Sequence, residues 1–162
     1  MKRLLIIFAV ALNLVLADAV VKELAAGLLK GAAAVEVIPG FFNLAYVENR
    51  GCAWGMFQGQ VWPLAVFAVA ALVFLVWKRK SVFGEGVLAR VTETLLYAGI
   101  LGNLIDRVFR GYVIDMFDFY WRTYHFPCFN IADICISAAA VLMMSAAFFP
   151  CNKNKNIKER LT

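Results

Sequence analysis

Four apolar segments constrain this chain most, because each is long enough to cross a bilayer as a helix. They cover approximately residues 4–21, 61–77, 87–105 and 131–149. An α-helix rises about 1.5 Å per residue, so about 20 residues span the roughly 30 Å of bilayer hydrocarbon. The mean hydropathy is +0.76 and only 17% of residues are charged, which is too apolar for a water-soluble protein of this length. We therefore predict a single, mainly α-helical, integral membrane domain over residues 1–162.

Three short clusters of basic residues predict the topology. They lie at residues 2–3, 78–80 and 153–160. By the positive-inside rule, all three clusters face the cytoplasm. Both termini would then be cytoplasmic, and residues 22–60 and 106–130 would be extracytoplasmic. The net charge of +5 comes from these clusters and not from one basic helix face, so we expect no nucleic-acid partner.

The first apolar segment also has the features of a signal peptide. It combines a basic start, an apolar stretch and small residues near Ala17. Cleavage would leave three apolar segments and would put the basic C-terminal tail on a different side from residues 78–80. We therefore expect this segment to remain as a membrane helix.

The two outward segments differ in composition. Residues 35–58 mix β-branched and aromatic residues with one proline and several glycines, which predicts short strands and turns. Residues 112–129 are dense in aromatic side chains, and Tyr and Trp favour the headgroup level of a bilayer. We expect a small sheet at the membrane surface beside an interfacial loop.

An unusually charged stretch, GNLIDRVFRGYVIDMFDFY, follows the third apolar segment at residues 102–120. Ionisable groups near a bilayer are costly unless they are paired or hydrated, so they usually mark function. Gly111 suits the left-handed residue that ends a helix. Two polar pairs lie four residues apart, on shared helix faces: Asn103 with Arg107, and Asp106 with Arg110.

Two aspartates bound the second outward segment at a similar depth. Asp115 follows the third apolar segment, and the fourth begins with Asn130 as a helix N-cap and Asp133 in the first turn. Two carboxylates held close can share one proton, so that one activates water while the other polarises a carbonyl oxygen. The helix N-terminus favours negative charge, so we expect Asp133 to be the ionised member and Asp115 the protonated one. The alternative is that Asp133 only completes the helix start and Asp115 pairs with an arginine.

Other polar residues have ordinary structural interpretations. Asp18 and Lys22 would form a helix-end ion pair, and Asn49 would form a turn. Glu93 should pair with Arg90 or with a lysine of the neighbouring loop.

The cysteines and the single histidine show no metal-binding spacing, so we expect no metal and no cofactor. Cys52 and Cys128 both fall in outward segments. The sequence alone leaves open whether they form a disulfide or stay as two free thiols.

The order NRGCAWG, GNLIDRVFRGYVID and FNIAD, on four apolar segments with an early Asp-x-x-x-Lys, closely resembles the lipoprotein signal peptidase (signal peptidase II) family. The resemblance covers nearly the whole chain. It implies four transmembrane helices, a small extracytoplasmic β-cradle and a short interfacial helix or loop. It also implies an aspartic endopeptidase of the bacterial inner membrane, with its active site at the extracytoplasmic face.

This family resemblance assigns candidate roles. The substrates would be prolipoproteins, cleaved before the diacylglyceryl-modified cysteine of the lipobox, and the enzyme would act as a monomer among membrane lipids. Asp115, and not Asp118, fills the Gly-x-Val-x-Asp position and would be catalytic together with Asp133. The residues that match the supporting positions of the site are Asp18, Lys22, Asn49, Gly51, Asn103, Arg107 and Asn130.

Two residues depart from the family pattern. Cys52 stands where the family usually has alanine, and Met116 where it usually has phenylalanine. Two other classes of membrane protein are alternatives. A proton-coupled transporter would place its acids near mid-bilayer and show a repeat between halves, whereas a non-catalytic membrane scaffold would tolerate replacement of both aspartates.

Overall fold

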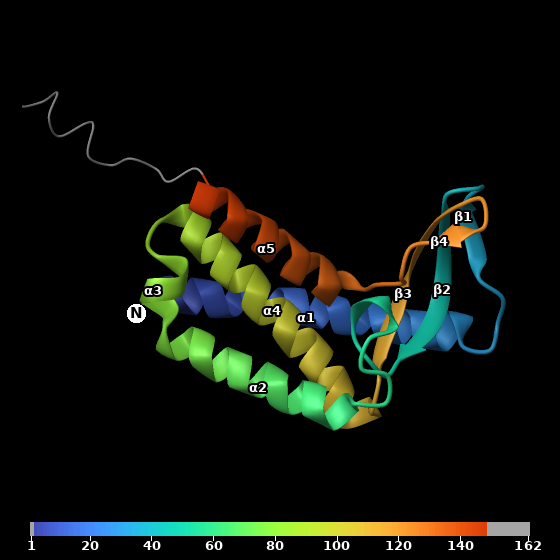
Figure 1. The fold of residues 1–162 in the computed structure, drawn as a ribbon, viewed down its shortest axis with the longest axis horizontal. Helices are drawn as coiled ribbons and strands as arrows, with labels where there is room; N and C mark the ends of the chain where they lie inside the picture. Colours follow the sequence, from blue (N-terminus) through green and yellow to red (C-terminus); the bar gives the residue numbers. More distant parts are fainter. Residues whose placement is uncertain (1, 149–162) are drawn as a thin grey trace, which may run out of the picture.

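The computed structural model describes residues 2–148, which form a helical bundle with a small sheet at one end (Figure 1). The basic cluster at residues 153–160 lies outside the described residues. In chain order, the elements are α1 (Lys2–Leu29), β1 (Val35–Ile38), β2 (Phe42–Asn49), the 3₁₀ helix η1 (Ala53–Gly55), α2 (Val61–Trp77), α3 (Arg79–Phe83), α4 (Val87–Arg110), β3 (Val113–Trp121), β4 (Tyr124–His125) and α5 (Ile131–Phe148).

The helix α4 is the centre of the bundle, because α1, α2 and α5 all pack against it. One face of α4 is polar and buried, and it includes Asn103 and Asp106. The α4–α5 contact is close: a Cβ atom added at Gly99 would lie 2.5 Å from the carbonyl oxygen of Ala132. This contact fixes the start of α5 beside the polar face of α4.

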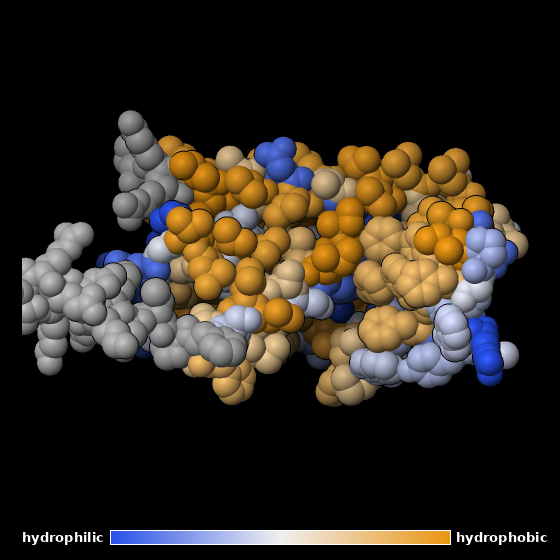
Figure 2. Space-filling model, turned by 90° about the horizontal axis from the view of Figure 1, so that it is seen from above, coloured by the Kyte–Doolittle hydropathy of each residue, from blue (hydrophilic) through white to orange (hydrophobic). Residues whose placement is uncertain are grey.

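Two of the helices in residues 2–148 are long and apolar enough to cross a membrane by length and composition. They are α1, over Leu4–Leu29, and α5, while α2 is apolar but shorter. On the face drawn in Figure 2, hydrophobic residues cover most of the helical part, and hydrophilic residues gather mainly toward the ends.

The sheet is antiparallel, with the strand order β1-β2-β3-β4. Ile114 and Met116 of β3 are fully buried and pack with Ala25 near the end of α1. Because side chains alternate along a strand, Asp115 lies on the opposite face from these two residues. We call the end of the bundle that carries β1 to β4 the sheet end.

Two boundaries differ from the sequence prediction, and a third agrees with it. The helix α1 continues to Leu29 instead of ending near residue 21, because Asp18 and Lys22 are buried and Lys22 pairs with Asp106 of α4, so these charges do not interrupt the helix. The helix α4 runs to Arg110, where Gly111 takes the left-handed conformation (φ 77°), as predicted. Residues 112–129 form β3 and β4 instead of an irregular loop, because β3 finds a long partner in β2.

Candidate active site

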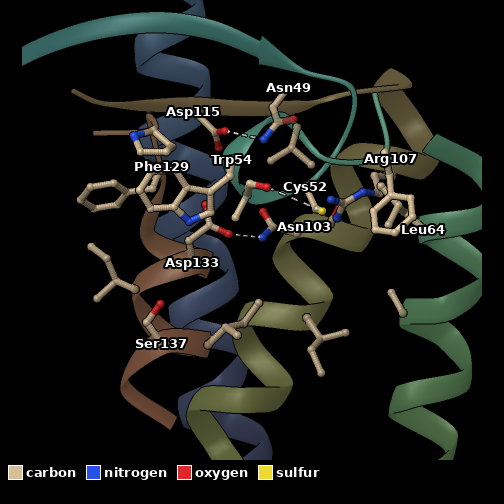
Figure 3. Close-up of a pocket in the computed structure, with 18 of the residues that line it drawn as sticks. Asn49, Cys52, Trp54, Leu64, Asn103, Arg107, Asp115, Phe129, Asp133 and Ser137 are labelled. Carbon is tan, nitrogen blue, oxygen red and sulfur yellow. Dashed lines mark hydrogen bonds between the residues drawn. The ribbon is translucent and has the colours of Figure 1, made fainter. Parts of the chain in front are cut away.

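The two predicted catalytic aspartates line one cavity of about 1550 Å³ at the sheet end of the bundle. Asp115 comes from β3 and Asp133 from the first turn of α5. Figure 3 shows both side chains facing the same space. Asn49, Asn103 and Arg107 line this cavity too.

Asn130 connects the two aspartates. Its side-chain Nδ2 donates to Asp115 Oδ1 at 2.7 Å, and its backbone N donates to Asp133 Oδ2 at 3.2 Å. Its Oδ1 accepts from the backbone N of Asp133 at 2.9 Å, which confirms Asn130 as the N-cap of α5. The Asn130 side chain is completely buried, so this bridge is held rigidly.

Each carboxylate accepts a further amide hydrogen bond. Asn49 Nδ2 donates to Asp115 Oδ2 at 2.9 Å, and Asn103 Nδ2 donates to Asp133 Oδ1 at 2.7 Å (Figure 3). An amide is neutral, so these groups orient the carboxylates without supplying a full positive charge. The amide oxygens of Asn49 and Asn103 each accept a further hydrogen bond, which holds the amides in place. The asparagines therefore fix the geometry of both acids.

The ionisation of Asp115 is strongly perturbed. Burial raises the pKa of its carboxyl group to about 7, and the negative charge of Asp133 acts in the same direction. The hydrogen bonds from Asn49 and Asn130 oppose this rise because they favour the charged form. Near neutral pH, Asp115 is therefore poised between its protonated and ionised forms.

A buried lysine supports the site from behind. Lys22 Nζ lies 2.7 Å from Asp18 Oδ2, 2.9 Å from Asp106 Oδ2 and 3.2 Å from Asn103 Oδ1. Asp18 accepts from the backbone N of Ala132, and Asp106 accepts from that of Ile114. The cluster thus joins α1, α4, β3 and α5.

This cluster corrects the sequence interpretation of Asp18 and Lys22 as an ordinary helix-end pair, since Lys22 is only 1% exposed. Sequence reasoning also missed Asp106 as a member of the site and assigned it only to Arg110, which it does contact at 2.9 Å. The available signal was its spacing of three residues from Asn103, which places both on one face of α4.

Arg107 anchors the turn that carries Asn49. Its Nη2 donates to the carbonyl oxygen of Gly51 at 3.0 Å and its Nη1 to that of Asn103 at 3.3 Å. The backbone N of Gly51 donates in turn to Asn49 Oδ1 at 2.9 Å. A Cβ atom at Gly51 would lie 2.4 Å from the carbonyl oxygen of Met56, so this turn requires glycine.

The rest of the cavity is apolar and partly aromatic. Trp54 of η1 makes an edge contact with Phe126, with ring centroids 5.4 Å apart. Away from the aspartates, the walls come from α2, α4 and α5 and include Leu64, Phe67, Ile100 and Val141. The cavity therefore presents one polar end and a long apolar surface.

Several other sequence predictions can be compared with the structure. Glu93 pairs with Arg79 of α3, so the prediction of Arg90 or a lysine was wrong. Cys52 and Cys128 both line the cavity, and both are free thiols. Within residues 2–148 there is no group of three or more side chains that could hold a metal ion.

This chain is similar to known proteins over most of its length. Residues 10–149 match the family described as signal peptidase (SPase) II. A lipoprotein signal peptidase of Symbiobacterium thermophilum is 38% identical over 82% of this chain and 88% of its own length. One of Fusobacterium nucleatum is 42% identical over 76% of this chain and 74% of its own length.

The fold has solved counterparts. A bacterial membrane enzyme determined by the in meso method at 2.3 Å resolution matches with a TM-score of 0.78 and 31% identity, covering 91% of this chain and 90% of that chain. A second one, at 1.9 Å resolution, matches with a TM-score of 0.75 and 31% identity, over 89% of this chain and 93% of that chain. The likeness in fold therefore includes the sheet end as well as the helices.

Proposed function

The chain belongs to the signal peptidase II family, and on this basis we propose that it is an aspartic endopeptidase that removes signal peptides from prolipoproteins. Asp115 and Asp133 would activate the water that cleaves the bond before the diacylglyceryl-modified cysteine. The observation that carries this proposal is that the two acids share one cavity and one bridging amide, Asn130.

The chemistry follows from the two environments. Asp133, at the N-terminus of α5, would be the ionised member and would take a proton from water, whose oxygen then attacks the scissile carbonyl carbon. Asp115, protonated below about pH 7, would donate a hydrogen bond to the carbonyl oxygen as negative charge develops there. When the intermediate collapses, the proton held by Asp133 passes to the departing amine nitrogen.

The supporting residues hold the two aspartates in position. Asn49, Asn103 and Asn130 orient the two carboxylates, and Arg107 fixes the turn at Gly51. All of these residues come from one chain, so we propose that the enzyme works as a monomer.

The family is one of membrane proteases, and this chain is an integral membrane protein. We propose four membrane spans formed by α1, α2, α4 and α5, in the bacterial inner membrane, with the sheet end outside the cytoplasm. A prolipoprotein is held in the bilayer by its signal helix and acyl chains. The apolar walls of the cavity would receive these parts by lateral entry, while the peptide bond meets the polar end.

Cleavage of a diacylglyceryl-modified prolipoprotein by purified protein in detergent, with a metal chelator present, tests the dyad. Wild type and Glu85→Gln should cleave, because Glu85 is exposed in the turn before α4. Asp115→Asn and Asp133→Asn should each lose at least about 10³-fold in rate, since either change removes one of two groups that act as a unit.

The other possible outcomes would contradict different parts of the proposal. Cleavage by both folded asparagine variants at the wild-type rate would refute the dyad. Activity lost only with the chelator would refute the metal-independent mechanism. If folded wild type did not cleave, a transporter or a scaffold would become the better interpretation.

A further inference from the structure

The segment that follows β3 forms part of the cavity wall. Residues 124–130, which we call the return segment, run back along β3 and end at the N-cap of α5. Its backbone is tied to β3 by Phe126 N to Phe119 O at 2.8 Å and by Phe117 N to Phe129 O at 2.9 Å. Phe126, Cys128 and Phe129 of this segment line the cavity.

A carboxylate that the catalytic mechanism does not use lies beside the return segment. Asp118 is 6% exposed and does not line the cavity. Its Oδ1 accepts from His125 Nδ1 at 2.8 Å, and its Oδ2 accepts from Asn43 Nδ2 at 2.9 Å. Asp118 thus connects β2, β3 and the start of the return segment.

The imidazole ring of His125 has few other partners. It stacks on Tyr120 with ring centroids 5.1 Å apart and an interplanar angle of 11°. The Tyr120 hydroxyl is bonded in turn to Glu36 of β1. His125 is half-exposed, so its contact with buried Asp118 is its main link to the protein interior.

Phe126, the next residue along the chain, contacts other aromatic residues that line the cavity. Phe126 contacts Trp54 of η1 and also packs edge-on against Phe129 at 6.0 Å. Because His125 and Phe126 are neighbours in the chain, the His125–Asp118 contact holds the backbone next to Phe126. A strand of only two residues, β4, holds the start of this segment by its backbone.

We propose that Asp118 and His125 are positioning residues that hold the return segment as a substrate-binding wall. This proposal rests on the function proposed above, because the wall is assigned to binding the lipid-modified prolipoprotein. Neither residue takes part in the chemistry. Losing their contact should weaken substrate binding and leave the catalytic step unchanged.

Steady-state kinetics of two His125 variants tests this. His125→Phe keeps a ring that can stack on Tyr120 but loses the donor to Asp118, and it should raise KM roughly tenfold while kcat stays within about twofold. His125→Asn carries an amide nitrogen the same number of bonds from Cα as Nδ1, and it should bring KM back toward wild type. Should His125→Phe fail to fold, His125→Ala replaces it.

Two results would overturn the proposal. One is an unchanged KM in His125→Phe, including the case in which only kcat falls, which indicates a smaller folded fraction. The other is a KM in His125→Asn that is raised as much as in His125→Phe. The route through Phe126 has its own test. In a Phe126→Ala background, His125→Phe should raise KM no further. If it raised KM by the same factor as in wild type, the effect of His125 would not pass through Phe126.

A second readout does not depend on peptidase activity. Burial raises the pKa of the Cys128 thiol to about 11, so it reacts slowly while the return segment is held in place. His125→Phe should accelerate maleimide modification of Cys128, mapped by mass spectrometry, at least about threefold relative to wild type. An unchanged labelling rate would refute the positioning role. Loss of cleavage in wild type, with this acceleration present, would instead refute only the proposed function.

Discussion

At the scale of single residues, the two aspartates differ in what surrounds them although both accept amide hydrogen bonds. Asp133 sits at a helix N-terminus and accepts from the backbone N of Asn130, whereas Asp115 sits on a buried strand and, among residues 2–148, accepts only from side chains. Backbone N–H groups at a helix start stabilise negative charge. This asymmetry supports the different roles proposed for the two acids.

A pH profile tests the role of Asp115. Its pKa is raised from an ordinary value near 4 to about 7, so the group is protonated below pH 7 and ionised above it. Above pH 7 neither carboxylate can donate to the carbonyl oxygen, so kcat/KM should fall about tenfold per pH unit once the pH is well above this value.

The infrared carbonyl band of the protonated carboxyl should disappear over the same pH range. It should persist in Asp133→Asn and be absent at neutral pH in Asp115→Asn, with Glu85→Gln behaving as wild type. A band lost in Asp133→Asn and retained in Asp115→Asn would reverse the two assignments. A rate that keeps rising from pH 7 to pH 9 would also count against them, because the protonated fraction of Asp115 should fall over that range.

At the scale of elements, the sequence predicts the parts of the site that depend on local signals. The cap at Asn130 and the helix end at Gly111 both follow from residues close together in the chain. The extent of α1 and the presence of the strand β3 do not follow from such local signals. They depend on partners far along the chain, since Lys22 meets Asn103 and β3 pairs with β2.

The buried lysine cluster gives a prediction about how the elements are joined. Lys22→Met leaves Asp18 and Asp106 facing each other without their shared cation, in a site where both are almost fully buried. Losing one partner of a buried ionic cluster costs about 3–5 kcal/mol, so the thermal unfolding temperature in detergent should fall markedly. Cleavage should fall too, because Asp18 and Asp106 hold the starts of α5 and β3.

Lys30→Met is the matched control. Lys30 is exposed and pairs with Glu48 at 3.3 Å, and an exposed ion pair contributes little to stability because water screens it. Its unfolding temperature and cleavage rate should therefore stay close to wild type. If both methionine variants were equally stable, the cluster would not be what joins α1 to the other elements.

At the scale of the whole molecule, the polar site lies at one end of the bundle and the apolar cavity wall extends away from it along α2, α4 and α5. The sequence predicts this polarity through its basic clusters, because one of them, at residues 78–80, falls at the opposite end, where α3 begins (Figure 1). The shape of the cavity is beyond sequence reasoning, since it depends on how α2 and α5 pack on opposite parts of α4.

The proposed orientation in the membrane can be measured by cysteine accessibility in spheroplasts. In a chain whose native cysteines are replaced, Arg122→Cys at the tip between β3 and β4 should react with a membrane-impermeant maleimide added from outside. Glu85→Cys, in the turn before α4, should react only after the membrane is permeabilised, because residues 78–80 should hold that end in the cytoplasm. Labelling of both sites from outside would refute the four-span topology, and the reverse pattern would invert it. An inverted chain would place Asp115 and Asp133 on the cytoplasmic side, where they would meet prolipoproteins from the wrong face of the membrane.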